Sequence, residues 1–209
     1  MAVKVIIISC GPGGKDSITL EALKKIDSCH VLIGSLRLLA TFAPAEKEQI
    51  PLKGIMENLK PIINEHRGNT VGILVTGDAG LYSLAKTVIR LCEADKVEII
   101  PGVSSLQAAF SRLGSSWENV ETFSFHGRPF ESLEDLRRAD RAAVFCDRIN
   151  SARAILMKML PLEADKRYFV CQNLTLDNEM IIEVKSYEDL QKVEEVSTEL
   201  LVILRQTNG

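Results

Sequence analysis

Three glycine-bearing loops contain the residues of this chain that are best suited to bind a ligand. They occupy residues 9–16, 76–82 and 101–105, and each follows a short apolar run of the kind that forms a buried strand. In open α/β sheets, ligands bind at the carboxyl ends of the strands, where such loops lie. Because all three loops would open on the same edge of the sheet, they predict one shared ligand site.

The first loop, Ser9-Cys10-Gly11-Pro12-Gly13-Gly14-Lys15-Asp16, does not match a known phosphate-binding motif. The pattern GxGxxG would need glycine in place of Asp16, and Pro12 stiffens the turn that the glycines should free. The pattern GxxxxGKS fails because Asp16 follows Lys15. Two interpretations remain: a tight strand-to-helix turn that needs glycine dihedrals, or a backbone surface that comes close to a ligand other than a pyrophosphate.

The other two loops offer polar side chains at strand ends. In the second loop, two glycines flank Asp78, which is expected either to bind a ligand or to cap the following helix. In the third loop, a strand breaks at Pro101-Gly102, and Ser104 and Ser105 open a helix. Either serine could bind a ligand or serve as an ordinary N-cap.

The sequence contains no familiar catalytic constellation. It lacks the patterns GxSxG and HExxH, and its three histidines are scattered. His30 and His66 are interpreted as structural, whereas His126 ends a predicted strand beside a glycine and is the candidate for proton transfer. A ligand-binding edge without acid–base machinery favours a reaction in which the protein mainly positions a reactive cofactor.

Arginine is concentrated in one part of the chain. Six of the twelve arginines lie between Arg128 and Arg153. A solvated helix face explains Arg137 and Arg138, but Arg128 follows a predicted strand and could bind an acidic substrate, because the guanidinium fork pairs well with carboxylates.

The elements that must position these residues follow an α/β pattern. In the first half, strands are predicted at residues 3–8, 30–33, 70–75 and 96–100, and helices at 19–26, 35–42, 55–65, 82–93 and 104–113. This alternation predicts a mostly parallel sheet covered on both faces. We therefore expect an N-terminal α/β domain over residues 1–113 and a linker at 114–119.

The second half, residues 120–209, is predicted to be a strand-richer α/β domain with a mixed or antiparallel sheet. Its strands are expected at residues 120–125, 142–146, 168–172, 180–184 and 199–204, and its helices at 132–138, 151–160 and 186–195.

Composition narrows the class of protein. The 209 residues are 46% hydrophobic and 25% charged, a balance that supports a globular core. A net charge of −3 argues against a nucleic-acid-binding surface, and no apolar run approaches the roughly 20 residues of a membrane-spanning helix. Five cysteines without a CxxC pair favour a reducing cytoplasm and give no metal site.

Taken in order, the three loops resemble the tetrapyrrole methylase family. The stretches that carry the resemblance are Gly11-Pro12-Gly13-Gly14, Gly77-Asp78-Ala79-Gly80-Leu81-Tyr82-Ser83 and Ile100-Pro101-Gly102-Val103-Ser104-Ser105. Within this family, Gly34-Ser35, residues 124–128 and Asp147-Arg148 are most like the branch that methylates carbon C5 of a corrin precursor, in its stand-alone form. One departure is Ala79, where the family usually has proline, so the loop is expected to be somewhat more mobile.

The resemblance implies two α/β domains with the active-site cleft between them, S-adenosylmethionine as the cofactor, no metal, and a homodimer. It places Ile8, Gly77, Asp78, Leu81, Ser104, Ser105 and Cys146 at the cofactor. It also places Gly11, Pro12, Gly13 and Arg128 at the tetrapyrrole, and the weakly acidic chain suits a small-molecule substrate. Two alternatives remain: the same fold acting on another tetrapyrrole position or on a macromolecule, as in diphthine or ribosomal RNA methylation, and a non-catalytic tetrapyrrole-binding protein.

Overall fold

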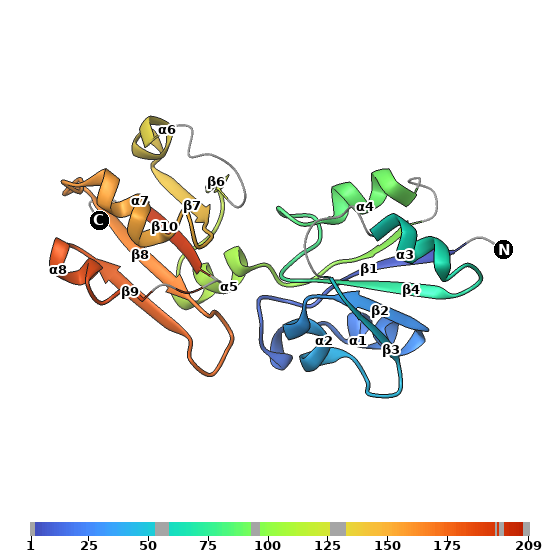
Figure 1. Cartoon of the computed structure of the whole chain (residues 1–209). Coiled ribbons are helices and arrows are strands. Elements are labelled where there is room, and N and C mark those ends of the chain that lie inside the picture. The colour runs from blue at the N-terminus through green and yellow to red at the C-terminus, as the bar shows by residue number, and fades with distance from the viewer. Residues whose placement is uncertain are drawn as a thin grey trace. The chain divides into compact units, whose positions relative to one another are not determined.

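The chain forms two compact units in a computed structural model that describes residues 3–52, 59–92, 97–125, 133–194, 196 and 199–206. The units comprise Met1–Ser104 and Ser105–Gly209, and each is built on a five-stranded sheet (Figure 1). The prediction of an α/β protein with two sheets is confirmed. The expected cleft between the two domains stays a prediction.

The sheet of the first unit is entirely parallel, as predicted, with the strand order β3-β2-β4-β1-β5. Its strands are β1 (Lys4–Ser9), β2 (Val31–Gly34), β3 (Glu48–Pro51), β4 (Thr70–Val75) and β5 (Val97–Ile100). Its helices are α1 (Leu20–Ser28), α2 (Leu36–Phe42), α3 (Leu59–Glu65) and α4 (Ala85–Cys92), and a short 3-10 turn covers Lys15–Ser17.

Helices cover both faces of this sheet, because the central strands are apolar on both sides. Successive side chains of a strand point to opposite faces. Val5 and Ile7 of β1 therefore pack in a core with α3 and α4, whereas Ile6 and Ile8 pack in a second core with α1 and α2. Figure 1 shows the two pairs of helices on opposite sides of the sheet.

The second unit has a mixed sheet with the order β6-β7-β10-β8-β9, which confirms that prediction. Strands β6 and β7 are parallel, and the other neighbours are antiparallel. The strands are β6 (Glu121–Ser124), β7 (Arg141–Phe145), β8 (Lys166–Gln172), β9 (Met180–Val184) and β10 (Glu199–Arg205). The helices are α5 (Ser105–Arg112), α6 (Leu133–Arg138), α7 (Ala152–Met159) and α8 (Tyr187–Leu190).

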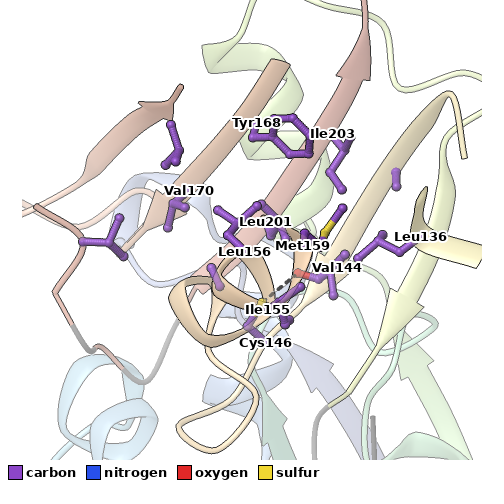
Figure 2. Close-up of a cluster of buried hydrophobic side chains, with 14 of the residues drawn as sticks. Leu136, Val144, Cys146, Ile155, Leu156, Met159, Tyr168, Val170, Leu201 and Ile203 are labelled. Carbon is purple, nitrogen blue, oxygen red and sulfur yellow. Dashed lines mark hydrogen bonds between the residues drawn. The ribbon is translucent and has the colours of Figure 1, made fainter. Parts of the chain in front are cut away.

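One apolar core fixes the second sheet against its helices. Leu156 and Met159 of α7 and Leu136 of α6 pack with Leu201 and Ile203 of β10 (Figure 2). Helix α5 packs against β10 as well, so it belongs with the second unit. The two units consequently divide at Ser104 and Ser105, upstream of the stretch 114–119 that the sequence favoured as the junction.

Strand β3 is absent from the sequence-based prediction. Its residues, Glu48-Gln49-Ile50-Pro51, carry no apolar alternation, and none of them is buried. The strand forms at the edge of the sheet, where β2 is its one neighbour among the described strands. Among the described residues, no helix is long and apolar enough to cross a membrane.

Candidate functional site

The three glycine-bearing loops lie at one edge of the first sheet, as predicted. They follow β1, β4 and β5, and β1 pairs in parallel with both of the other strands. At the carboxyl ends, Ser9 of β1 is opposite Val75 of β4, and Ile8 is opposite Ile100 of β5. The three loops therefore begin at neighbouring points of the same edge.

Backbone hydrogen bonds join the first loop to the second. The amide of Cys10 donates to the carbonyl of Val75 at 2.9 Å. Beyond it, the Gly77 amide donates to the Gly11 carbonyl at 2.7 Å, and the Gly11 amide donates back to the Gly77 carbonyl at 3.2 Å. Gly11 and Gly77 have φ of 72° and 71°, a region where glycine carries no steric penalty. The pairing thus extends the contact between β1 and β4 into their loops.

A buried side chain adds a second link between these loops. Ser9 is fully buried, and its Oγ atom accepts a hydrogen bond from the Ala79 amide at 2.8 Å. Proline has no amide hydrogen, so the proline that the family usually carries here could not make this bond. This bond restricts the movement of Ala79, whereas alanine in place of proline was expected to make the loop more mobile.

Asp78 links the second loop to the third. Its Oδ1 atom accepts a hydrogen bond from the Gly80 amide at 2.8 Å, and its Oδ2 atom accepts one from the Gly102 amide at 2.8 Å. Because α4 begins only at Ala85, the alternative in which Asp78 caps that helix is wrong. The carboxylate instead fixes the relative position of two strand-end loops.

Close packing at Gly102 completes the junction. A Cβ atom built on Gly102 would lie 2.5 Å from Cβ of Ser9 and 3.0 Å from the carbonyl oxygen of Gly77. No larger residue fits there without displacing the backbone. The three loops therefore form one interlocked surface.

Asp78 is able to hold a hydroxyl-bearing ligand as well as the loops. An ionised carboxylate offers about four acceptor positions, and the two backbone amides occupy two of them. The residue is half-buried and lies in the loop that follows β4. A carboxylate flanked by glycines suits the ribose hydroxyls of a nucleoside.

The other cofactor residues predicted in the first unit differ in how deeply they are buried. Leu81 is half-buried, and Ser104 is buried and directly precedes α5. Ile8 has no exposed surface, and its side chain packs in the core with α1 and α2. Next to Leu81, Tyr82 has φ of 47°, a conformation that is uncommon outside glycine and concentrates at functional sites.

The predicted substrate residues Gly11, Pro12 and Gly13 lie in the loop that follows β1, and all three are buried. His126 and Arg128, the predicted proton-transfer and substrate-binding residues, lie outside the described residues. The structure therefore gives no position for either of them.

Ser105 and Cys146 belong to the second unit. Ser105 is the first residue of α5, and Cys146 follows β7. The Cys146 thiol is buried and donates to the carbonyl of Val144 at 3.4 Å (Figure 2), and burial raises its pKa well above the ordinary range.

The second unit also contains a buried carboxylate that the sequence analysis did not single out. Glu199 is 8% exposed, and its Oε1 atom accepts a hydrogen bond from the Ala152 amide at the start of α7 at 2.6 Å. Its Oε2 atom accepts one from the side-chain amide of Gln172 at 3.1 Å. A carboxylate at a helix N-terminus is stabilised by the helix dipole, so Glu199 fixes α7 to the sheet.

Within the described ranges, no group of three or more histidine, cysteine, aspartate or glutamate side chains is arranged to hold a metal ion. All five cysteines are free thiols.

An all-parallel sheet with interlocked strand-end loops is thus followed along the chain by a unit with a mixed sheet. The sequence matches the family Tetrapyrrole (Corrin/Porphyrin) Methylases over residues 4–189. It is similar to a probable cobalt-precorrin-7 C(5)-methyltransferase of Methanocaldococcus jannaschii, with 30% identity over 192 residues that cover 89% of this chain and 90% of that protein. The chain belongs to the tetrapyrrole methylase family.

Solved structures share the fold. A precorrin-6Y methylase from Archaeoglobus fulgidus has a TM-score of 0.74 with 21% identity, covering 98% of this chain and 99% of that one. A uroporphyrin-III C-methyl transferase from Thermus thermophilus, complexed with S-adenosylhomocysteine, has a TM-score of 0.76 with 18% identity and covers 96% of this chain and 97% of that one.

Proposed function

We propose that this protein transfers a methyl group from S-adenosylmethionine to carbon C5 of a corrin precursor in cobalamin biosynthesis. The observation that carries the proposal is the interlocked edge built by Asp78, Gly77 and Gly102 in a chain of this family. The similarity to a probable cobalt-precorrin-7 C(5)-methyltransferase over most of both chains supports the choice of C5.

In this proposal, the loops after β4 and β5 hold the cofactor. S-adenosylmethionine supplies a methyl group that its positive sulfonium sulfur has already activated. Asp78 accepts hydrogen bonds from the ribose hydroxyls, Gly77 brings backbone close to the cofactor, and Leu81 gives it an apolar contact. Ser104, Ser105 and Cys146 complete the cofactor residues, and the fully buried Ile8 supports the loops from the core beneath them.

The tetrapyrrole residues in the proposal are Gly11, Pro12, Gly13 and Arg128, with His126 as the residue that moves a proton. The protein's contribution is to align the electron-rich ring carbon with the methyl group and to exclude water, because alignment alone supplies a large part of the rate in such transfers. Fixed backbone is well suited to this task, and the hydrogen bonds among the three loops restrict their movement.

Mass spectrometry of the product tests the function. The protein would be incubated with S-adenosylmethionine carrying a ¹³C-labelled methyl group and with a panel of metal-free and cobalt-containing corrin precursors, and heat-denatured protein is the control. We expect one labelled methyl group on a single precursor, located at C5 by NMR. Folded protein that binds S-adenosylhomocysteine but methylates no precursor of the panel would contradict the proposal.

We also propose that the protein acts in the cytoplasm as a homodimer. The five free cysteines, four of them buried, support a reducing compartment. Light scattering coupled to size-exclusion chromatography measures the mass in solution, and a monomer at all protein concentrations would refute the homodimer.

A further inference from the structure

Arg37 lies at the same edge of the first sheet as the three loops. It is in the first turn of α2, which follows β2, and β2 pairs with β4. Its Nη2 atom donates a hydrogen bond to Oγ1 of Thr76, the first residue after β4, at 3.0 Å. Arg37 is therefore close to the end of β4.

The Arg37 guanidinium has no counter-charge within the described part of the chain. Its Nη1 atom is buried and has no hydrogen-bond partner, and no described carboxylate lies within ion-pair distance. Burial lowers the pKa of Arg37 from its ordinary value, although the group stays protonated at neutral pH. A partly buried charge without a counter-charge is costly, and an anion bound to the guanidinium would offset that cost.

Some other described arginines have a carboxylate or an aromatic ring as a partner. Several have carboxylate partners, namely Arg112, Arg138, Arg167 and Arg205. Arg141 also has one buried nitrogen without a partner, but its Nη2 atom donates to Ser115 and Ser116, and its guanidinium stacks over Phe110. These partners of the Arg141 guanidinium all come from the second unit.

We propose that Arg37 binds a carboxylate of the corrin substrate and so orients the ring at the edge of the sheet. The inference rests on the proposed function for the identity of the substrate. A planar guanidinium binds carboxylates with two parallel hydrogen bonds, and the acetate and propionate groups of a corrin precursor are carboxylates of this kind. The hydrogen bond to Thr76 fixes the orientation of the guanidinium through Nη2, and the buried Nη1 has no partner.

The carboxylate could also come from the methionine part of the cofactor, but the position of Arg37 favours the substrate. The links that involve Asp78 run from β4 across to β5, through Gly102. Arg37 lies in α2, which follows β2, and β2 pairs with the side of β4 that faces away from β1 and β5. The hydrogen-bond partner of Arg37, Thr76, directly precedes Gly77, which pairs with Gly11, one of the glycines that we assign to the tetrapyrrole.

The test compares Arg37→Met, which removes the charge, with Arg90→Met. Arg90 is a matched control, because it is an exposed helical arginine of the same unit that also donates to a threonine hydroxyl, Thr87 Oγ1 at 3.3 Å. A direct readout is the binding of cobyrinic acid, a stable corrin with free acetate and propionate groups. Cobinamide, in which these groups are amides, reports binding that needs no carboxylate.

We expect Arg37→Met to weaken cobyrinic acid binding and to raise KM for the corrin precursor by roughly ten- to a hundredfold, the effect of losing a charge-assisted pair. The kcat, the affinity for S-adenosylhomocysteine, the binding of cobinamide and the melting temperature should stay close to those of the wild type. Arg37→Lys should recover part of the affinity, because it restores the charge without the fork. Arg90→Met should change none of these quantities.

Three results would overturn the inference. If Arg37→Met binds cobyrinic acid as tightly as the wild type does, the inference is refuted, even if the wild-type enzyme methylates C5. A loss of S-adenosylhomocysteine affinity with corrin binding intact would assign Arg37 to the cofactor. A large fall in melting temperature together with losses for both ligands would make Arg37 structural. If instead the wild type methylates no corrin but its binding of cobyrinic acid still depends on Arg37, the carboxylate site stands and only the proposed function fails.

Discussion

Replacing Asp78 with alanine should lower both the stability of the protein and its affinity for the cofactor. The substitution removes two hydrogen bonds to an ionised carboxylate, one from the Gly80 amide and one from the Gly102 amide. A hydrogen bond to a charged group contributes about 1.5–3 kcal/mol. Gly80 is exposed, so water replaces its lost partner, whereas Gly102 is half-buried and is compensated less well.

We therefore expect the free energy of unfolding to fall by about 2 kcal/mol, most of it from the Gly102 bond. For a chain of this size, each kcal/mol shifts the melting temperature by about 2–4 °C, which gives a decrease of about 4–8 °C. Asp78→Asn keeps one acceptor oxygen but turns a donor towards an amide hydrogen, so its loss should lie between the wild type and alanine. Asp27→Ala, on an exposed position of α1, is the control and should change the stability by less than about 0.5 kcal/mol.

The assay combines thermal unfolding of each variant with calorimetric titration by S-adenosylhomocysteine. A wild-type melting temperature in Asp78→Ala, with cofactor affinity lost, would show that the carboxylate serves the ligand alone and that the bond to Gly102 contributes nothing. Unchanged affinity with a lowered melting temperature would remove Asp78 from the cofactor site and leave it as a structural link. A variant that matches the wild type in both measurements would refute the whole argument for the interlocked loops.

Two further predictions concern the loops and the thiols. Ala79→Pro should lower the free energy of unfolding by about 1–3 kcal/mol, because it leaves the buried Ser9 hydroxyl without its donor. Chemical denaturation should show a much smaller loss when the same change is made in Ser9→Ala. Equal losses in both backgrounds would mean that the bond is unimportant. Cys92 is the half-buried thiol among five, so a maleimide at about pH 8 should label it first in the native protein, as judged by peptide mass spectrometry, and Cys92→Ser should abolish the early labelling. Rapid labelling of Cys10, whose pKa burial raises to about 12, would contradict the packing at the end of β1.

The sequence predicts the loop edge well because its determinants are local. Each loop is a glycine-rich segment after an apolar run, and the rules for parallel sheets bring such segments to one edge. The bounds of β4 and β9 match the predicted strands. Strand β3 could not be predicted in this way, because Glu48–Pro51 has no apolar pattern and is specified by pairing with β2.

The partners of individual side chains could not be predicted from the sequence. Nothing in the sequence around Asp78 indicates that its carboxylate reaches Gly102, twenty-four positions later. Arg37 looks like any arginine on a helix, and its importance depends on Thr76, thirty-nine positions away, and on the burial of one nitrogen. One sequence signal could have pointed to this region. Gly34-Ser35 marks a fourth strand end at the same edge, and the Ser35 side chain caps α2, the helix that contains Arg37.

The edge of the first sheet carries two charged side chains, and only the negative one is compensated by hydrogen bonds to backbone amides of the described residues. The negative charge of Asp78 is satisfied by two backbone amides and fixes the loops after β4 and β5. The positive charge of Arg37, beyond the other side of β4, lacks an anion among the described residues. In the proposed function the cofactor offers ribose hydroxyls, whose hydrogen bonds a carboxylate accepts, whereas a corrin precursor offers carboxylates, which pair with a cation. The two charges therefore favour the cofactor at Asp78 and the corrin at Arg37. Exchanging the two charges, with Asp78→Arg and Arg37→Asp in one chain, should therefore impair the binding of both ligands rather than swap their places, because the backbone amides that neutralise Asp78 would repel an arginine.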